Sequence, residues 1–156
     1  MFLARDIMTA PTISVSKDNN VKAALDLLAE HNISGPPVID NDGKVVGILS
    51  GSDIIRYSQQ KKVVPVSSIS FWVSPYSETD DIASVRNGFE ILHRTIIENL
   101  MTRKVYTVSM DTPISEVAKL MINRKINRVP VVDNDGKLAG IISRADLVKF
   151  MAGSEN

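Results

Sequence analysis

The chain contains an internal repeat that aligns with itself without a gap. Residues 5–58 lie over residues 98–151, a constant offset of 93 positions, and 18 of the 54 aligned residues are identical. The identities gather where backbone geometry matters, above all in the matching Asp-Asn-Asp-Gly-Lys segments at 40–44 and 133–137. Such self-similarity indicates a fold built from two copies of one structural unit.

Each copy predicts a short strand followed by a helix. The β-branched strands are expected at residues 12–15 and 105–108. The helices are expected where apolar residues recur at the i, i+3, i+4 and i+7 spacing. These residues are Val21, Ala24, Leu25 and Leu28 in the first copy, and Ile114, Val117, Ala118 and Met121 in the second. Thr112 is expected to cap the second of these helices, with Pro113 at its first position.

A hairpin and a second helix complete each copy. Asp-Gly between β-branched runs favours a tight hairpin turn. It would join residues 37–40 to 44–49 in the first copy and 130–133 to 137–142 in the second. A helix is then expected after Ser50 and after Ser143. The predicted order is therefore strand, helix, strand, strand, helix.

One copy of about 54 residues is marginal as an independent domain. We therefore expect an α/β fold of α+β type, with two units packed sheet to sheet about a pseudo-twofold axis. The expected domains are 1–60 and 98–156, and residues 61–97 form a linker. A helix is expected at 79–100, with a possible break at Asn87-Gly88. The linker also carries Phe71, Trp72 and Tyr76, for which burial against the repeats is the favoured interpretation.

Composition excludes several classes of function. There is no cysteine, so disulfides, thiolate catalysis and Cys-ligated zinc are excluded. Lys plus Arg and Asp plus Glu both number 18, so the basic surplus typical of nucleic-acid binders is absent. No apolar run is long enough to cross a membrane, and residues 1–10 do not resemble a signal peptide. We expect a cytoplasmic protein without a metal site, for which nucleic acid is an unlikely partner.

The ordered motifs resemble a known family. A Pro-Val-(Ile/Val)-Asp strand, an Asp-Gly turn and a closing Gly-Ile-(Leu/Ile)-Ser-x-x-Asp occur in both copies. Together they resemble the CBS (cystathionine-β-synthase) domain, and a pair of such domains is called a Bateman module. The resemblance implies the fold order given above, frequent homodimers and regulation of attached or partner proteins. It also implies a ligand without any cofactor: AMP, ADP, ATP or S-adenosylmethionine, with AMP or ATP favoured.

The Ser-x-x-Asp motif has two interpretations. It opens a helix, whose free N–H groups suit phosphate or ribose oxygens, and its carboxylate can accept both ribose hydroxyls. The same spacing is also a capping box, which stabilises a helix start without any ligand. The motif alone indicates a cap more often than a ligand site. Two copies in this family context favour binding.

The family pattern joins the closing motif of one repeat to the first strand and the residues before proline of the other. The nucleotide-binding residues expected on that pattern form two sites. Site A comprises Ile48, Ser50, Ser52, Asp53, Tyr106, Asn127 and Arg128, and site B comprises Ile13, Ser34, Gly35, Ile141, Ser143 and Asp146. Arg128 is the expected phosphate ligand because a guanidinium binds phosphate in a bidentate manner. Site A, which contains it, is therefore expected to be the better phosphate site.

Three functions compete at this point. The leading one is a non-enzymatic sensor of adenine nucleotides, which would act on an unknown regulated protein. An enzyme is rejected because the repeats take up nearly all of the chain, which leaves no room for a catalytic barrel, and because there is no cysteine nucleophile. A protein-interaction scaffold or an RNA- or DNA-binding adaptor is the alternative, supported only by the linker aromatics and by Lys61-Lys62.

Overall fold

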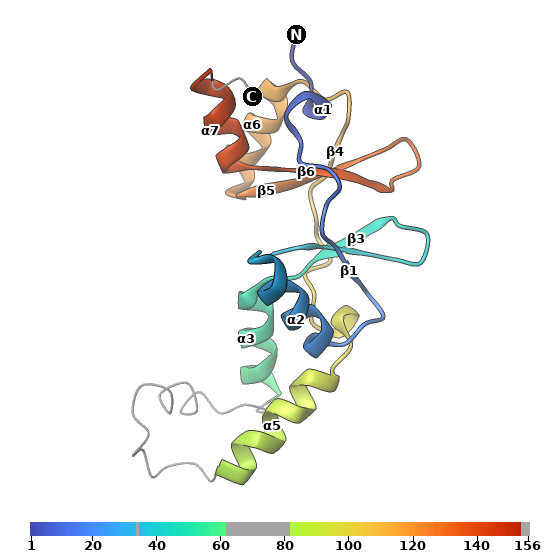
Figure 1. Ribbon diagram of the computed structural model, residues 1–156, viewed down its shortest axis with the longest axis vertical. Coiled ribbons are helices and arrows are strands. Elements are labelled where there is room, and N and C mark those ends of the chain that lie inside the picture. Colours follow the sequence, from blue (N-terminus) through green and yellow to red (C-terminus); the bar gives the residue numbers. More distant parts are fainter. Residues whose placement is uncertain (34, 62–81, 154–156) are drawn as a thin grey trace. The chain divides into compact units, whose positions relative to one another are not determined.

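The computed structural model describes residues 1–33, 35–61 and 82–153. The elements before the linker are α1 (Ala4–Ile7), β1 (Val15–Ser16), α2 (Val21–His31), β2 (Pro37–Ile39), β3 (Val45–Ile48) and α3 (Gly51–Gln60) (Figure 1). The later elements are α5 (Ile82–Arg94), the 3₁₀ turn η1 (Ile97–Asn99), β4 (Val108–Ser109), α6 (Ile114–Arg124), β5 (Arg128–Val132), β6 (Leu138–Ser143) and α7 (Arg144–Met151). The predicted element order is confirmed in both repeats.

Each repeat contributes one three-stranded sheet. The strand orders are β1-β2-β3 and β4-β5-β6. In the second sheet β4 runs parallel to β5, and β5 pairs with β6 in the antiparallel sense. The hairpin turns follow their sequence signal, because Gly43 and Gly136 both take a φ of +80°, a conformation that glycine tolerates. The predicted mixed α/β class is confirmed.

Three local predictions were wrong in detail. The first strand of each repeat begins at Val15 or Val108 and is only two residues long. Thr112 does not cap α6: its Oγ1 accepts a hydrogen bond from the Ser109 amide at 3.0 Å, and Pro113 takes the cap position. The helix expected at 79–100 is α5 followed by η1, and it runs unbroken through Asn87-Gly88. Residues 79–81 lie outside the described residues.

The packing units do not coincide with the sequence repeats. Unit 1 comprises Met1–Ser14, Ile39–Gly47 and Lys104–Asn156, and unit 2 comprises Val15–Val38 and Ile48–Arg103. The N-terminal part of each repeat thus belongs to the unit that holds most of the other repeat. The domain limits 1–60 and 98–156 describe the duplication and remain a prediction.

In unit 1 the N-terminal segment completes the fold of the second repeat. The buried core unites this segment with α6, α7 and the β4-β5-β6 sheet. Its members are Ala4, Val108, Ile114, Val117, Met121, Val129, Val131, Ile142 and Leu147. Two hydrogen bonds, 2.8 and 3.0 Å long, pair Thr9 with Ile141. Gly140 permits this approach, because a Cβ there would lie 2.5 Å from Met8 Sδ and 3.0 Å from the Thr9 carbonyl oxygen.

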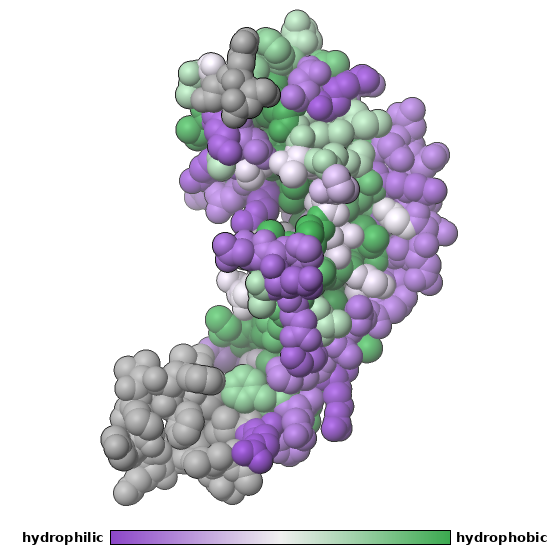
Figure 2. All heavy atoms as spheres, viewed as in Figure 1, coloured by the Kyte–Doolittle hydropathy of each residue, from purple (hydrophilic) through white to green (hydrophobic). Residues whose placement is uncertain are grey.

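Several large apolar side chains of unit 1 reach the surface. Met1, Ile122 and Met151 are 99, 76 and 75% exposed. Figure 2 shows hydrophobic residues on the surface around the N-terminus. The Phe2 ring meets Phe150 of α7 edge to face, with centroids 4.9 Å apart. These exposed apolar side chains offer a surface for the homodimer that the family resemblance implies. The homodimer remains a prediction.

In unit 2 residues 95–103 run as a strap along the first repeat. The Ile97 amide donates to the Asn19 carbonyl at 2.9 Å, and the Glu98 amide donates to the Lys17 carbonyl at 3.0 Å. Further along, the backbones of Thr102 and Ile48 exchange two hydrogen bonds of 2.9 Å. Ile97 is fully buried, which anchors the strap in the core. Helix α5, which precedes the strap, packs against α2.

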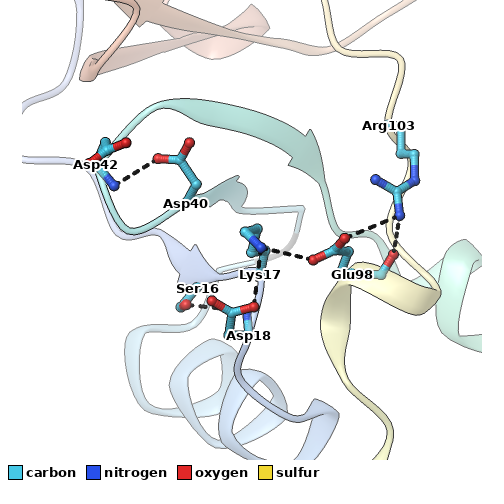
Figure 3. Close-up of polar contacts among 7 residues, drawn as sticks. All are labelled: Ser16, Lys17, Asp18, Asp40, Asp42, Glu98 and Arg103. Atoms are coloured by element: carbon cyan, nitrogen blue, oxygen red, sulfur yellow. Dashed lines mark hydrogen bonds and ion pairs between the residues drawn. The ribbon is translucent and has the colours of Figure 1, made fainter.

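An ion-pair cluster reinforces the strap (Figure 3). Lys17 Nζ lies 3.0 Å from a Glu98 carboxylate oxygen and 3.2 Å from Asp18, and Arg103 approaches Glu98 from the other side. Hydrogen bonds to Glu98 and then Asp18 raise the pKa of Lys17 above its usual 10.5. The hydrogen bond from Lys17 lowers the pKa of Glu98 below its usual 4.5. The pair therefore favours the folded state while both partners are charged.

The equivalent ion pair in unit 1 has the opposite polarity. Arg5 occupies the position equivalent to Glu98, and its guanidinium pairs with Asp111. The backbone contact is conserved between the units, because the Arg5 amide donates to Met110 just as the Glu98 amide donates to Lys17. Each segment thus carries the charge that suits the repeat on which it lies.

Replacing Glu98 with glutamine should make the stability difference from wild type depend on pH. A lowered folded-state pKa contributes stability above the unfolded value, and that contribution is lost as pH falls through the folded value. We therefore expect Glu98→Gln to be slightly less stable at neutral pH and equal to wild type in strong acid. Urea denaturation at several pH values measures this. The control is Glu90→Gln on the exposed side of α5, and a Glu98→Gln deficit that persists in acid would contradict the ion-pair explanation.

Candidate functional site

Both predicted Ser-x-x-Asp motifs form complete capping boxes. Ser50 caps α3: its Oγ accepts from the Asp53 amide at 3.2 Å, and its own amide donates to Asp53 Oδ2 at 2.9 Å. Ser143 caps α7 in the same way, with distances of 3.2 and 2.8 Å to Asp146. The capping interpretation is thus confirmed for both motifs. It does not exclude a ligand, because each aspartate commits only Oδ2 to the cap.

The second oxygen of Asp53 is already occupied. Thr102 Oγ1 donates to Asp53 Oδ1 at 2.7 Å, and a guanidinium N–H of Arg56 donates to the same atom at 3.1 Å. The Ser50 hydroxyl adds a further contact to Oδ2 at 3.1 Å. A carboxylate offers about four acceptor positions, and all of these are filled. The Asp53 residue is only 2% exposed.

Asp146 is the equivalent residue, and its second oxygen is open. The residue is half-buried. Among the described residues Asp146 Oδ1 has no hydrogen-bond partner, and no described side-chain oxygen is both buried and unpaired. Oδ1 is therefore accessible to solvent. Thr9, equivalent to Thr102, makes the same backbone pairing but no bond to this carboxylate, and Lys149, equivalent to Arg56, makes no ion pair with it in the described ranges.

Arg128 and Asn127 lie beside the α7 cap within unit 1. Arg128 is paired with Ser143 across the β5–β6 ladder. The Asn127 carbonyl accepts a hydrogen bond of 2.8 Å from the Arg144 amide, at the first position of α7. Helix N-termini and guanidinium groups both attract anions, so this edge of unit 1 combines two features that suit a phosphate group.

Tyr106 adds an aromatic ring with cations over it. The Arg124 guanidinium lies 4.9 Å from the ring centroid and Lys104 Nζ lies 5.8 Å from it. The ring is half-buried. Cations over an aromatic face are attracted by its quadrupole, and they leave positive potential on this part of unit 1.

The other predicted site residues lie at the ends of the same elements. Ile48 pairs with Thr102, and Ile141 pairs with Pro130 and with Thr9. Ser52 is exposed on the first turn of α3, Ile13 is half-buried, and Gly35 has a φ of +72°. Ser34 lies outside the described residues. Both groupings, site A and site B, take residues from the two units, so they remain predictions.

Thr102 and Arg56 are absent from the predicted set. The signal for Thr102 was present, because the Met-Thr pair is identical in both repeats at 8–9 and 101–102. Nothing in the sequence shows that only one of the two threonines reaches an aspartate. Within the described ranges no group of three His, Cys, Asp or Glu side chains is placed to hold a metal. Of the linker features, Phe71, Trp72, Tyr76 and Lys62 lie outside the described residues.

Comparison with known proteins identifies the family. The model of the CBS domain matches the chain twice, at residues 4–60 and 97–153. The chain belongs to the CBS-domain family. It is 34% identical over 155 residues to MJ1426, an uncharacterized protein of Methanocaldococcus jannaschii. The alignment covers 97% of this chain and 92% of that protein. No helix among the described residues has the length and hydrophobicity to span a bilayer.

Two solved CBS-pair structures hold adenosine-containing ligands. One is CBSX2 in complex with AMP, with 26% identity, a TM-score of 0.71 and 98% of each chain covered. The other is the CBS pair of protein MJ0100 in complex with 5′-methylthioadenosine and S-adenosyl-L-methionine, with 26% identity, a TM-score of 0.69 and 99% of each chain covered. CBS pairs similar to this one therefore bind small molecules that contain adenosine.

Proposed function

We propose that this CBS pair is a non-catalytic regulatory module that binds an adenine nucleotide or S-adenosylmethionine. One observation carries the proposal: Asp146 presents an accessible carboxylate oxygen at the start of α7, in a family whose members bind adenosine derivatives. An ionised carboxylate accepts hydrogen bonds from both hydroxyls of a ribose, whereas a 2′-deoxyribose offers it only one. The ribose is then one binding determinant that AMP, ATP and S-adenosylmethionine share.

Each neighbouring residue has a role consistent with this ligand. Asp146 accepts the ribose hydroxyls. Ile141 supplies apolar surface for the base, and the start of α7 supplies positive potential for phosphate. Asp53 and its neighbours in site A form a second position of the same kind. Site A remains the predicted better phosphate site because the family pattern assigns Arg128 to it.

A ligand panel tests the proposal. Calorimetric titrations with AMP, ATP, S-adenosylmethionine and 2′-deoxyadenosine monophosphate are expected to show binding of one or more ribose ligands and at least about tenfold weaker binding of the deoxy compound than of AMP. The Arg128→Ala variant should weaken AMP binding about tenfold and leave adenosine binding unchanged, because one charge-assisted contact to phosphate is lost. Chromatography of the ligand after incubation should recover it intact. Conversion of any ligand, or no binding across the panel, would contradict the proposal.

The remaining predictions from the family concern the cell. We propose a cytoplasmic protein that acts as a homodimer on a regulated partner, with nucleic acid and membrane playing no part. Binding transmits a signal only if the ligand has different affinities for two states of the module. The scaffold or RNA- or DNA-binding alternative has no observation among the described residues in its favour.

A further inference from the structure

The two equivalent aspartates differ in what already occupies them. Asp53 Oδ1 holds the Thr102 hydroxyl at 2.7 Å and an Arg56 N–H at 3.1 Å. Asp146 Oδ1 holds no partner among the described residues. The difference is local, because the backbone pairing of Thr102 with Ile48 matches that of Thr9 with Ile141. The Thr102 hydroxyl, the Arg56 guanidinium and the deeper burial of Asp53 distinguish the two positions.

From this difference we propose that Thr102 is a latch: its hydroxyl closes Asp53 against a ribose, and the strap must release before Asp53 binds a ligand. The proposal rests on the proposed function. A ribose that takes both acceptor positions of Oδ1 displaces the Thr102 hydroxyl and the Arg56 N–H. Asp146 requires no such exchange. The module therefore has one prepared position and one gated position.

The strap connects the latch to the rest of unit 2. Residues 95–103 carry Thr102 near one end and Glu98 near the middle, where Glu98 pairs with Lys17. Figure 3 shows Arg103, next to Thr102 in the chain, reaching back to Glu98. Release of Thr102 therefore changes the contacts of residues that the ligand does not touch. A ligand bound to Asp53 therefore changes the position of the strap, whereas a ligand bound to Asp146 leaves the strap unchanged.

Thr102→Val separates the latch from the backbone pairing, because valine keeps the β-branched shape and loses only the hydroxyl. The matched control is Thr9→Val at the equivalent position. Both are made in the Asp146→Asn background, so that AMP binding reports on Asp53. We expect Thr102→Val to tighten AMP binding about 3- to 10-fold, the equivalent of one competing hydrogen bond. Thr9→Val should not change it. Unchanged or weaker binding in the Thr102→Val variant would overturn the latch.

A ligand-free measurement keeps the latch testable if AMP does not bind at all. Amide hydrogen exchange of Thr102 and Ile48 reports opening of the strap. We expect Thr102→Val to speed this exchange several-fold, while Thr9→Val leaves the exchange of Thr9 and Ile141 unchanged. Equal exchange rates in Thr102→Val and wild type would overturn the latch. Absence of AMP binding in wild type would instead count against the proposed function alone.

Discussion

Replacing Asp53 with alanine is expected to lower the free energy of unfolding by about 3 kcal/mol, against about 1 kcal/mol for the same change at Asp146. Both changes remove a helix cap, which costs about 1 kcal/mol. At Asp53 the change also removes the hydrogen bonds that Thr102 and Arg56 donate to a buried carboxylate. Hydrogen bonds to a charged group contribute about 1.5–3 kcal/mol, and the lower part of that range applies because both donors are exposed to solvent. At Asp146 the open oxygen has no described partner to lose.

Urea denaturation of wild type and the two alanine variants measures the difference. Equal m-values are needed, so that a shift in midpoint reports stability alone. Comparable costs at Asp53 and Asp146 would mean that the Thr102 and Arg56 contacts contribute nothing, and the distinction between the two carboxylates would fall with them. The result also bears on function, because a carboxylate that stabilises the fold so strongly is less free to serve a ligand.

Adding a single methyl group at Gly140 is expected to destabilise the protein by about 2 kcal/mol, as overpacking of a close contact does. A Cβ at this position would lie 2.5 Å from Met8 Sδ, 2.8 Å from Met8 Cγ and 3.0 Å from the Thr9 carbonyl oxygen. The Met8 side chain can rotate away. The Thr9 carbonyl is backbone, and its shift disturbs the two hydrogen bonds to Ile141.

Gly51→Ala is the control for Gly140→Ala, because nothing lies within 4 Å of a Cβ at Gly51. It sits in α3, where alanine is the better helix former by up to about 1 kcal/mol. Thermal denaturation should therefore show opposite signs for the two variants. Wild-type stability in Gly140→Ala would mean that the N-terminal segment does not lie against β6.

The sequence predicted the elements well where the signal is local. The Asp-Gly turns, the helical spacing from Val21 to Leu28 and the Ser-x-x-Asp caps all depend on residues a few positions apart. Each is found in the structure. The repeat presents each of these local signals twice. Thr112 failed as a cap because a competing local acceptor role, toward the Ser109 amide, was equally compatible with the sequence.

The exchange of segments between repeats could not be predicted. The offset of 93 makes residues 2–10 and 95–103 equivalent, but it does not show on which copy each of them packs. The ion pairs reflect this packing, because Arg5 pairs with Asp111 and Glu98 pairs with Lys17. On the second repeat Glu98 would meet Asp111 and Met110 in place of Asp18 and Lys17, so it would lose its cationic partner. Exposed ion pairs of this kind are individually weak, so the sequence alone does not predict which segment packs on which repeat.

The difference in hydrogen bonding between Asp53 and Asp146 could not be predicted from the sequence either. Asp53 and Asp146 share the Ser-x-x-Asp motif, and both are predicted as ribose ligands. What separates them is the contact that Thr102, 49 positions away, makes with Asp53, and an arginine at position 56 where the second repeat has Lys149. Sequence comparison of the repeats shows these residues without showing their contacts. The candidate site was thus predicted as a set of positions, and its internal asymmetry comes from packing.

A calorimetric titration of AMP into wild type and Asp146→Asn tests most directly whether the start of α7 is the ribose site. Asparagine preserves the size of the side chain and removes the charge that two hydroxyls would share. We expect wild type to bind AMP and Asp146→Asn to bind it at least about tenfold more weakly, with unfolding as cooperative as in wild type. Equal affinity in the two proteins would contradict the assignment of the ligand to Asp146.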